Sequence, residues 1–297
     1  MYFLSCAKRT TNLASINSSQ LKEFPVLLPS IPEQDCLIGI LNCWNTAIER
    51  TEKLIATKLA RKRGLMQQLL TGKKRFNEFA EQQWKQVHLG DVFRERCETL
   101  ADYLRKLRAK EPDKNQVNEK VSLELLSITA KEGVVSRDTL VKRDTSSEDK
   151  SKYLRICAGD IGYNTMRMWQ GVSGLSALEG IVSPAYTICT PTKEIDGKFA
   201  SYLFKHVPVV HLFWRYSQGL VDDTLNLKFD NFAPIKVLIP SSIDEQRRIA
   251  AVLETCDQEI ELLRKQLAAL KRQKRGLMQK LLIGQIRVNI ETSEAAK

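Results

Sequence analysis

The 297-residue chain lacks the sequence features of several common protein classes. Its seven cysteines are scattered and odd in number, and no two form a CxxC pair, which argues against a disulfide framework or a cysteine zinc site. Such cysteine usage fits a reducing compartment, so we expect a cytoplasmic protein. No run approaches the roughly 18 apolar residues of a membrane span. The opening "MYFLSCAKRTTNLAS" also lacks the regions of a secretory signal.

Motifs for catalysis are missing as well. The histidines show no HxxxH spacing, and His211 is interpreted as a packing side chain near Trp214. The run "GVSGLSALEG" is neither a dinucleotide-binding loop nor a Walker loop. "SPAY" lacks the amide and the second proline of an adenine methyltransferase motif, and Asp222–Asp223 is interpreted as a turn. We therefore expect no catalytic residues, no metal site and no cofactor bound by this chain itself.

Acidic residues are outnumbered. The chain has 46 Lys and Arg against 35 Asp and Glu, a formal net charge of +11. Neutralisation of phosphates gives basic proteins a sequence-independent affinity for nucleic acid, although a basic face is also commonly only a solvated surface. Charge therefore makes nucleic acid a reasonable partner without identifying one.

One basic, Leu-rich phrase occurs twice. "RKRGLMQQLLTGKKRF" occupies residues 61–76, and "QKRGLMQKLLIGQIRV" begins at residue 273. The two copies keep a constant offset of 212 residues, which extends upstream to the Ile-x-Glu-Gln of residues 31–34 and 243–246. Before that, "FPVLLPSIPEQ" matches "IKVLIPSSIDEQ" after a one-residue slip, which predicts an apolar strand and a Pro-Ser turn in each copy. The chain thus contains a duplicated module.

Each phrase ends a segment with helical periodicity. In the second copy, apolar residues recur in alternating steps of four and three, the a/d pattern of a coiled coil. These residues are Ile249, Leu253, Cys256, Ile260, Leu263, Leu267, Leu270, Leu277 and Leu281. The first copy has the same seam at Leu37, Leu41, Trp44, Ile48, Ile55, Leu65 and Leu69, interrupted by Thr51, Lys58 and Lys62.

Helix boundaries follow from capping residues. Ser30 and Asp244 stand where N-caps belong, and Gly72 and Gly284 stand where helices end. Two helices of roughly 38 residues, each about 57 Å long, are predicted to pack as an antiparallel coiled coil. The alternative is that each helix packs only against the core of its own domain.

Basic residues cluster near the end of both helices. They are Lys58, Arg61, Lys62, Arg63, Lys271, Arg272, Lys274 and Arg275. They could simply interact with the helix dipole and with solvent. The alternative is a partner surface, which is duplicated because the partner is present twice.

The segment between the helices predicts a separate α+β domain. Polar stretches at 105–120 and 142–152 indicate loops. "YLRICAGDIGYNTMRMWQG" and "GIVSPAYTICTP" indicate strands bounded by Gly and Pro. "KFASYLFKHVPVVHLFWRY" indicates a helix interrupted near Pro208.

These motifs together resemble the specificity (S) subunits of type I restriction–modification systems. The resemblance rests on the "LP…EQ" entry to each helix, the "KRGLMQ-LL-G" ending of each, "W…V-LGDVF" and "GDIGYNTMRMWQG". Such subunits alternate two DNA target-recognition domains with two long helices. The resemblance covers the chain from about residue 14 onward and implies these segments: residues 1–30, the remnant end of a first recognition domain; 31–80, spacer helix 1; 81–241, the recognition domain; 242–290, spacer helix 2; and 291–297, a disordered tail.

The resemblance implies a non-catalytic subunit that reads double-stranded DNA, at one half-site for one domain. It also implies two methyltransferase subunits as partners and, through them, a restriction subunit, with S-adenosylmethionine, ATP and Mg²⁺ on those partners. Side chains suited to base edges or stacking are Asn164, Thr165, Arg167, Trp169, Gln170, Ser173, Arg215, Ser217 and Gln218. The remaining alternatives are a coiled-coil scaffold that binds protein and a truncated, silent product that forms a homodimer.

Overall fold

The structure, a computed structural model, describes residues 8–9, 14–23, 25–110, 123–140, 147–221 and 224–288. It divides into two compact units, one of residues 59–258 and one of residues 1–58 with 259–297. Two long helices contribute to both units: α3 (Ile31–Leu69) and α10 (Ile243–Leu282). The expected α+β fold, a mixed domain flanked by two long antiparallel helices, is confirmed.

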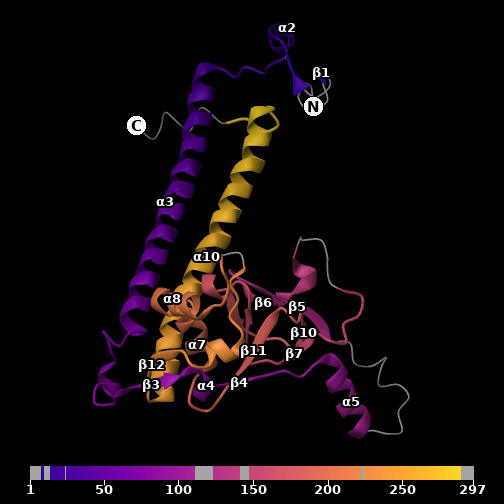
Figure 1. The fold of residues 1–297 in the computed structure, drawn as a ribbon. Coiled ribbons are helices and arrows are strands. Elements are labelled where there is room, and N and C mark those ends of the chain that lie inside the picture. Colours follow the sequence, from indigo (N-terminus) through magenta and orange to yellow (C-terminus); the bar gives the residue numbers. More distant parts are fainter. Residues whose placement is uncertain are drawn as a thin grey trace. The chain divides into compact units, whose positions relative to one another are not determined.

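In the unit formed by the chain ends, α3 and α10 run side by side in opposite directions (Figure 1). Lys58 pairs with Glu259 at 2.7 Å, and Glu52 pairs with Lys271 at 2.7 Å. Residue numbers therefore fall along one helix as they rise along the other. The unit also contains three short elements: β1 (Lys8–Arg9), β2 (Ala14–Ser15) and α2 (Ser18–Lys22).

The predicted seam is the least exposed stripe of both helices. Leu37 and Leu281 are 7% and 5% exposed, and Ile260 is 2% exposed. The polar interruptions are accommodated locally. Thr51 is buried, and its hydroxyl donates to the Ala47 carbonyl at 2.7 Å, which satisfies the polar group inside the seam. Lys58 uses the flexible end of its side chain to reach an acid on the other helix.

Two details at the helix starts correct the sequence predictions. The N-cap of α10 is Ser242, whose hydroxyl accepts a hydrogen bond from the Glu245 N–H at 3.4 Å, and Asp244 lies in the first turn. The segment 25–30 is not a strand, whereas its counterpart is β12 (Lys236–Pro240). The difference is a partner: β12 is hydrogen-bonded to β3 (Trp84–His88), and the described residues provide 25–30 with no such strand.

Residues 59–258 fold around two four-stranded sheets (Figure 1). One has the order β6-β5-β10-β7, with β5 and β10 parallel and the other pairs antiparallel: β5 (Glu124–Thr129), β6 (Gly133–Ser136), β7 (Leu154–Ile156) and β10 (Gly180–Val182). The other is antiparallel throughout, in the order β4-β11-β8-β9: β4 (Phe93–Glu95), β8 (Ile161–Asn164), β9 (Ser173–Leu175) and β11 (Tyr186–Pro191).

Helices complete this unit: α4 (Leu89–Val92), α5 (Leu100–Lys110), α7 (Gly197–Leu203), α8 (Val207–Tyr216), α9 (Phe229–Phe232), and the 3-10 turns η1 (Asn77–Phe79), η2 (Arg137–Thr139) and η3 (Met168–Gln170). The predicted loop at 105–120 is wrong as far as residue 110, because α5 continues to there with an amphipathic pattern. Residues 111–122 and 141–146 lie outside the described residues, as do Asp222–Asp223 and the predicted tail at 291–297. The predicted helix break is confirmed, at residues 204–206 just before Pro208.

Two apolar cores hold the sheets and helices together. A small one lies between the sheets and contains Leu126, Ile128, Val134, Ile156, Val182 and Ile188. A larger one joins the β4–β11–β8 surface to α7, α8 and α9 through packed phenylalanines. Phe204 and Phe232 lie at its centre, with ring centroids 5.6 Å apart in an edge-to-face arrangement. The loops that leave β8 and α8 therefore start from rigid supports.

Candidate nucleic-acid interface and helix-pair surfaces

A closed loop connects β8 to β9 and contains most of the predicted DNA-contacting residues. We call residues 164–173 the recognition loop. The Arg167 carbonyl accepts hydrogen bonds from the N–H groups of Gln170 and Val172, and the Val172 carbonyl accepts one from the Asn164 N–H, at 3.0–3.2 Å. Met168 is fully buried and anchors the loop, whereas Arg167 and Gln170 are exposed. The loop thus presents these two long polar side chains from a fixed backbone.

A second segment is hydrogen-bonded to this loop. The Leu227 N–H donates to the Thr165 carbonyl at 2.8 Å, and the Thr165 hydroxyl donates to the Ala185 carbonyl at 2.6 Å. Gln218 and Asn226 exchange backbone hydrogen bonds at 2.8 Å and so form an antiparallel bridge. Because α8 also packs against η3, the structure brings the predicted groups at 164–170 and 215–218 onto neighbouring segments.

Several of the predicted DNA-contacting residues use their polar side-chain groups in hydrogen bonds within the chain. The prediction for Ser173 is wrong, because Ser173 is only 1% exposed and its hydroxyl donates to the Gly171 carbonyl at 3.4 Å. The side chains of Asn164, Trp169 and Ser217 are bonded to backbone groups of Met166, Met166 and Phe213, respectively. The Gln218 amide donates to Asn231 at 3.2 Å. Within the described residues, this leaves the side chains of Arg167, Gln170 and Arg215 exposed and without a hydrogen bond or ion pair.

Helix α8 adds an aromatic surface beside the loop. His211 is exposed, which corrects its interpretation as a packing residue, and its ring lies 5.5 Å from that of Trp214. Trp214 and Tyr216 are 46% and 39% exposed. The buried histidine is His206, at 5% exposure, and burial lowers its pKa. Exposed aromatic rings beside an arginine, here Arg215 of the same helix, are a surface on which nucleic-acid bases stack well.

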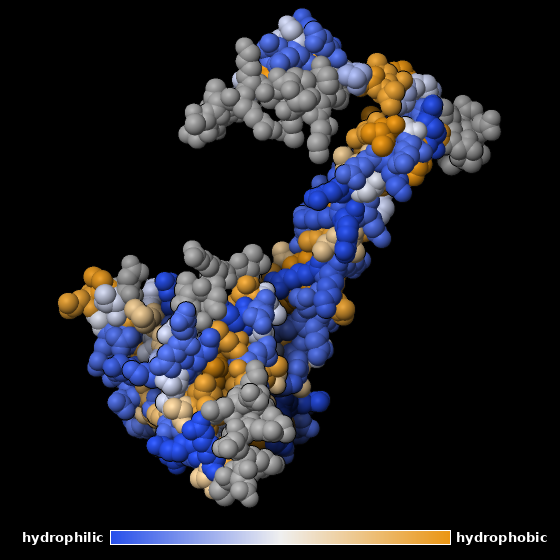
Figure 2. Space-filling model, turned by 90° about the vertical axis from the view of Figure 1, so that its right-hand side faces the viewer, coloured by the Kyte–Doolittle hydropathy of each residue, from blue (hydrophilic) through white to orange (hydrophobic). Residues whose placement is uncertain are grey.

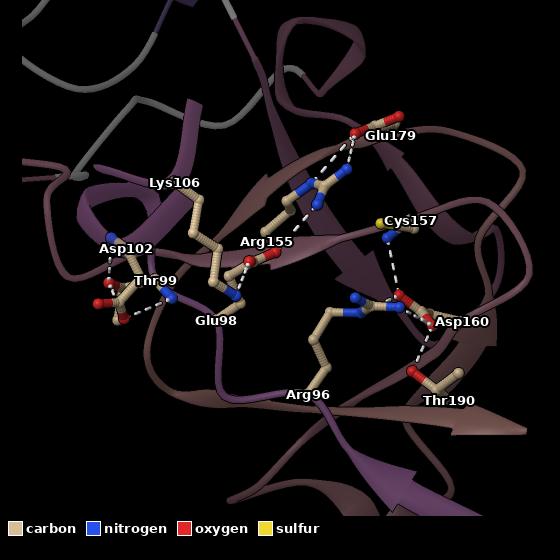
Figure 3. Close-up of polar contacts among 10 residues, drawn as sticks. All are labelled: Arg96, Glu98, Thr99, Asp102, Lys106, Arg155, Cys157, Asp160, Glu179 and Thr190. Atoms are coloured by element: carbon tan, nitrogen blue, oxygen red, sulfur yellow. Dashed lines mark hydrogen bonds and ion pairs between the residues drawn. The ribbon is translucent and has the colours of Figure 1, made fainter. Parts of the chain in front are cut away.

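Two ion-pair networks, which sequence reasoning missed, lie at the turn before β8 and on β7 (Figure 3). In the first, Arg96 binds both oxygens of Asp160, at 2.7 and 3.2 Å. Asp160 is 2% exposed and also accepts from the Thr190 hydroxyl and the Cys157 N–H. The hydrogen bond to Asp160 raises the pKa of Arg96. A carboxylate with every lone pair used in this way fixes the turn before β8.

The second network centres on Arg155 of β7. Its guanidinium binds Glu98 at 2.9 Å and Glu179 at 2.6 Å, and lies 4.0 Å from the ring centroid of Tyr103. Burial alone would lower the pKa of Arg155, but the hydrogen bonds to Glu179 and Glu98 outweigh it and raise the pKa. Lys106 of α5 shares Glu98 at 2.7 Å. These groups join α5 to β7 and leave no free charge for a ligand.

The eight predicted partner-binding residues divide into two groups. The four lysines are used within the chain: Lys58 binds Glu259, Lys62 binds Asp257, Lys271 binds Glu52, and Lys274 binds Asn45. The four arginines, Arg61, Arg63, Arg272 and Arg275, are exposed and make no ion pair within the described residues. Only Arg63 and Arg275 are related by the 212-residue offset.

The duplicated sequence also forms two copies of one helix-end clamp. Arg75 binds Glu245 through two hydrogen bonds at 2.9 and 2.8 Å, and Arg287 binds Glu33 through two at 2.6 Å. Each arginine and each glutamate is offset by 212 residues from its counterpart. The fixed offset was visible in the sequence, but it gave no reason to pair the end of one copy with the start of the other.

A second feature repeats with the clamp. The amide groups of Gln34 and Gln246 donate to the carbonyls of Pro29 and Pro240, each at 2.9 Å. Gly72 and Gly284 end their segments with φ of 70° and 68°. The duplicated module therefore has one local structure, present twice.

The two copies differ in what covers them. Val237 and Ile239 are 4% and 0% exposed, and Leu70 is 3% exposed. Their counterparts Val26, Leu28 and Leu282 are 64%, 82% and 57% exposed. In the first set, β3 and the large core cover the apolar groups. In the second set, apolar surface is bare at the end of the helix pair, where Figure 2 shows it in orange.

A groove of about 1120 Å³ lies between α3 and α10 near this bare end. Its apolar residues include Ile48, Met278 and Leu282, and Lys274 and Arg275 are basic. At the equivalent positions of the other copy, Tyr202 of α7 is inserted: its hydroxyl donates to Asp257 at 2.9 Å, and Lys62 lies 5.1 Å from its ring centroid. Burial and the adjacent carboxylate raise the pKa of Tyr202, so its hydroxyl keeps its proton.

Searches for other kinds of site gave negative results in the described part of the chain. No group of three or more His, Cys, Asp or Glu is arranged to hold a metal ion. No described helix has both the length and the apolar content to cross a membrane.

The sequence was compared with known proteins. It matches a family model described as the type I restriction modification DNA specificity domain over residues 81–272. A protein of Methanocaldococcus jannaschii, described as the type I restriction enzyme MjaX specificity subunit, is 26% identical over 302 residues. That match covers 96% of this chain and 65% of the relative, so the chain spans less than two thirds of that relative's length.

Solved structures show the same fold. The S subunit of a type I restriction–modification system from M. genitalium matches with a TM-score of 0.53 and 17% identity, over 94% of this chain and 68% of that one. A structure describing complex assembly and conformational transition of the type I R-M system matches with a TM-score of 0.52 and 15% identity, over 91% and 64% of the two chains. At these identities the structural likeness concerns the fold alone.

Proposed function

Because the chain belongs to the family of type I restriction–modification DNA specificity domains, we propose that it is a DNA sequence-specificity subunit that reads one half-site of a target. The observation that carries the proposal is the recognition loop, a fixed backbone that presents Arg167 and Gln170 outward beside the exposed aromatic rings of α8. Arginine and glutamine side chains pair with two atoms of guanine and of adenine, respectively, in the major groove.

The remaining predicted residues have different proposed roles. Arg215, at the end of α8, is exposed and suited to a phosphate contact. The other residues stabilise the recognition loop and the adjoining segment at 217–218 through the hydrogen bonds described above. They are Asn164, Thr165, Trp169, Ser217 and Gln218. Ser173 is left out of the proposed contact surface because it is buried.

Two variants, one at Arg167 and one control, test whether the recognition loop contacts DNA bases. Once the target is identified by sequencing methylated DNA from cells that express the chain with its methyltransferase, affinity is measured for target and random duplexes. Arg167→Ala is expected to weaken target binding by about 1–3 kcal/mol and random binding by less, because a base contact is lost. Arg94→Ala, at an exposed arginine of β4 outside the loop, is the control. Equal losses on both duplexes would reduce Arg167 to a phosphate contact.

We further propose that the helix pair docks two methyltransferase subunits through Arg63 and Arg275. They are exposed, without an ion pair, and related by the 212-residue offset, whereas the neighbouring lysines are engaged within the chain. A duplicated surface suits a partner present in two copies. In such a complex the restriction subunit joins through the methyltransferase subunits, which carry S-adenosylmethionine, while ATP and Mg²⁺ belong to the restriction partner. This chain itself has no catalytic role in the proposal.

Native mass spectrometry of the complex tests the docking sites separately. Arg63→Glu or Arg275→Glu is expected to reduce the number of bound methyltransferase subunits from two to one, and the double variant to abolish binding. Arg264→Glu, at an exposed position of α10 outside the duplicated clusters, makes the same charge change as a control. Two bound subunits on the double variant would refute the assignment.

A second candidate, self-association, is favoured by the bare end of the helix pair. The groove near Met278 is the counterpart of the site that α7 fills in the other copy, so we propose that it accepts α7 of a second copy of this chain. Light scattering should then give a mass that rises with concentration from 33.9 kDa toward twice that value. Leu282→Asp should remain monomeric, and Leu262→Asp, at a 67% exposed position elsewhere on α10, should behave as wild type. A monomer at all concentrations would exclude this candidate.

A further inference from the structure

One partly buried lysine is hydrogen-bonded to the recognition loop and has no role in the surfaces described so far. Lys205 follows α7, and its ammonium group donates to the carbonyl of Gly171 at 2.6 Å and to that of Ser173 at 2.8 Å. These two carbonyls belong to the residues before and after Val172, at the end of the loop that leads into β9. The lysine therefore spans from the α7–α8 connection to the end of the loop.

The backbone at this point lies close against the chain that follows α7. Gly171 ends η3 with φ of 75°, a conformation that glycine adopts without strain. A Cβ on Gly171 would lie 3.2 Å from Val210 and 3.4 Å from the Phe204 carbonyl, so the loop is pressed against the α7–α8 connection. The Gly171 carbonyl accepts a long hydrogen bond from the Ser173 hydroxyl, at 3.4 Å, and both the Gly171 and Ser173 carbonyls accept shorter ones from Lys205.

The environment of Lys205 fits a holding role better than a binding role. Burial lowers its pKa to about 8, so the site disfavours the charge that a DNA phosphate would favour. An ammonium group bonded to two carbonyls is also already directed into the protein. Exposed lysines in the same region, such as Lys198 on α7, instead pair with a carboxylate, here Glu254 at 2.7 Å.

We propose that Lys205 is a positioning residue, which fixes the recognition loop by holding the Gly171 and Ser173 carbonyls and does not itself contact DNA. The inference rests on the proposed function in one respect, because it takes this loop to be the part that reads bases. With the carbonyls held, Arg167 and Gln170 project from a single loop conformation, which reduces the ordering cost when the loop meets base edges. Without the two Lys205 hydrogen bonds, Arg167 and Gln170 would sample several positions. The ratio of target to random-duplex affinity would then fall more than the affinity for random DNA.

The first test needs no DNA. Amide hydrogen exchange is measured in Lys205→Met, which keeps the length of the side chain and removes its donors. The amides of Gln170, Gly171 and Val172 are expected to exchange at least about tenfold faster than in wild type, because local opening becomes easier. Amides of β11 and β12 should be unchanged, which shows that the fold is retained. Lys198→Met is the matched control and should leave the loop amides unchanged. Unchanged exchange in Lys205→Met would overturn the proposal.

The second test measures DNA binding. The ratio of target to random-duplex affinity should fall at least about tenfold in Lys205→Met, while the slope of log affinity against log salt stays at the wild-type value. A slope reduced by about 0.9 would mean that Lys205 neutralises a phosphate, which contradicts a positioning role. An unchanged ratio would contradict it as well.

The two tests keep this inference separate from the proposed function. If wild-type protein shows no preference for any sequence, the proposed function fails, and the exchange experiment still decides whether Lys205 holds the loop. If Lys205→Met does not fold, Lys205→Leu, which also removes the donors and has a shorter apolar side chain, takes its place with the same expected outcomes.

Discussion

The clamp between Arg75 and Glu245 offers a quantitative test of how the start of α10 is fixed within the unit of residues 59–258. Glu245 is completely buried and accepts two hydrogen bonds from Arg75 and one from Trp84 Nε1 at 3.3 Å. Arg75 also donates to the carbonyls of Phe79, Ala80 and Gln82. Glu245→Gln removes the charge while keeping the shape, so the guanidinium loses its counter-ion in place.

The magnitude follows from burial. Removing one partner of a fully buried ion pair costs about 3–5 kcal/mol of unfolding free energy. The side chain of Arg75 is 20% exposed, so water recovers part of its solvation. The three carbonyls also continue to accept from the guanidinium. We therefore expect a loss of about 3 kcal/mol, at the lower end of that range.

Urea unfolding, followed by tryptophan fluorescence, measures this loss, because Trp84 lies in the clamp. The second copy is the internal control. Glu33→Gln breaks the equivalent pair, in which the Arg287 side chain is 72% exposed, so the loss there should be clearly smaller. Equal losses at the two sites, or a loss below about 1 kcal/mol for Glu245→Gln, would refute the argument from burial.

Three further predictions concern single groups. Gly72→Ala and Gly284→Ala should each cost about 1 kcal/mol at positive φ, with the larger loss at Gly72, where a Cβ would lie 3.3 Å from Trp84, as thermal unfolding can show. Lys205 has a pKa of about 8 in the folded protein, below its ordinary 10.5. As pH rises between these values, the folded protein loses this proton before the unfolded chain does, so the free energy of unfolding increases. Relative to Lys205→Met, wild type should gain about 2 kcal/mol between about pH 7.5 and about pH 9.5, and no gain would contradict the shift. Asp160→Asn should lower unfolding free energy by about 3 kcal/mol, since it leaves a guanidinium facing an uncharged group, and a loss within about 0.5 kcal/mol would be inconsistent with that network.

The helical part of the fold was predictable because its signals are periodic and repeated. The a/d seam predicted both helices, and the duplicated phrase predicted ends at Gly72 and Gly284, within three residues of the observed ends at Leu69 and Leu282. The strand expected at 25–30 was wrong because strand formation depends on a partner, which β12 has in β3. A local pattern carries no information about the distant chain that completes a sheet.

The candidate site was predictable in its location and less so in its details. The run "YNTMRMWQGVS" combines polar and aromatic residues between two strands, which pointed to a loop. Side-chain direction was not predictable, so Ser173 was included although it is buried, and His211 was interpreted as packed although it is exposed. The clamps and the Arg96–Asp160 network join residues far apart in sequence, and their geometry arises only from the packed sheets.

In the proposed function, residues 164–173 and the adjoining end of α8 read DNA sequence. The most direct measurement is selection of bound duplexes from a random library by the intact chain, repeated at rising salt. We expect enrichment of one short motif, loss of that enrichment in Arg167→Ala, and a log affinity that falls linearly with log salt concentration as phosphate contacts are screened. A library that stays random, bound with an affinity independent of salt, would contradict the proposed function.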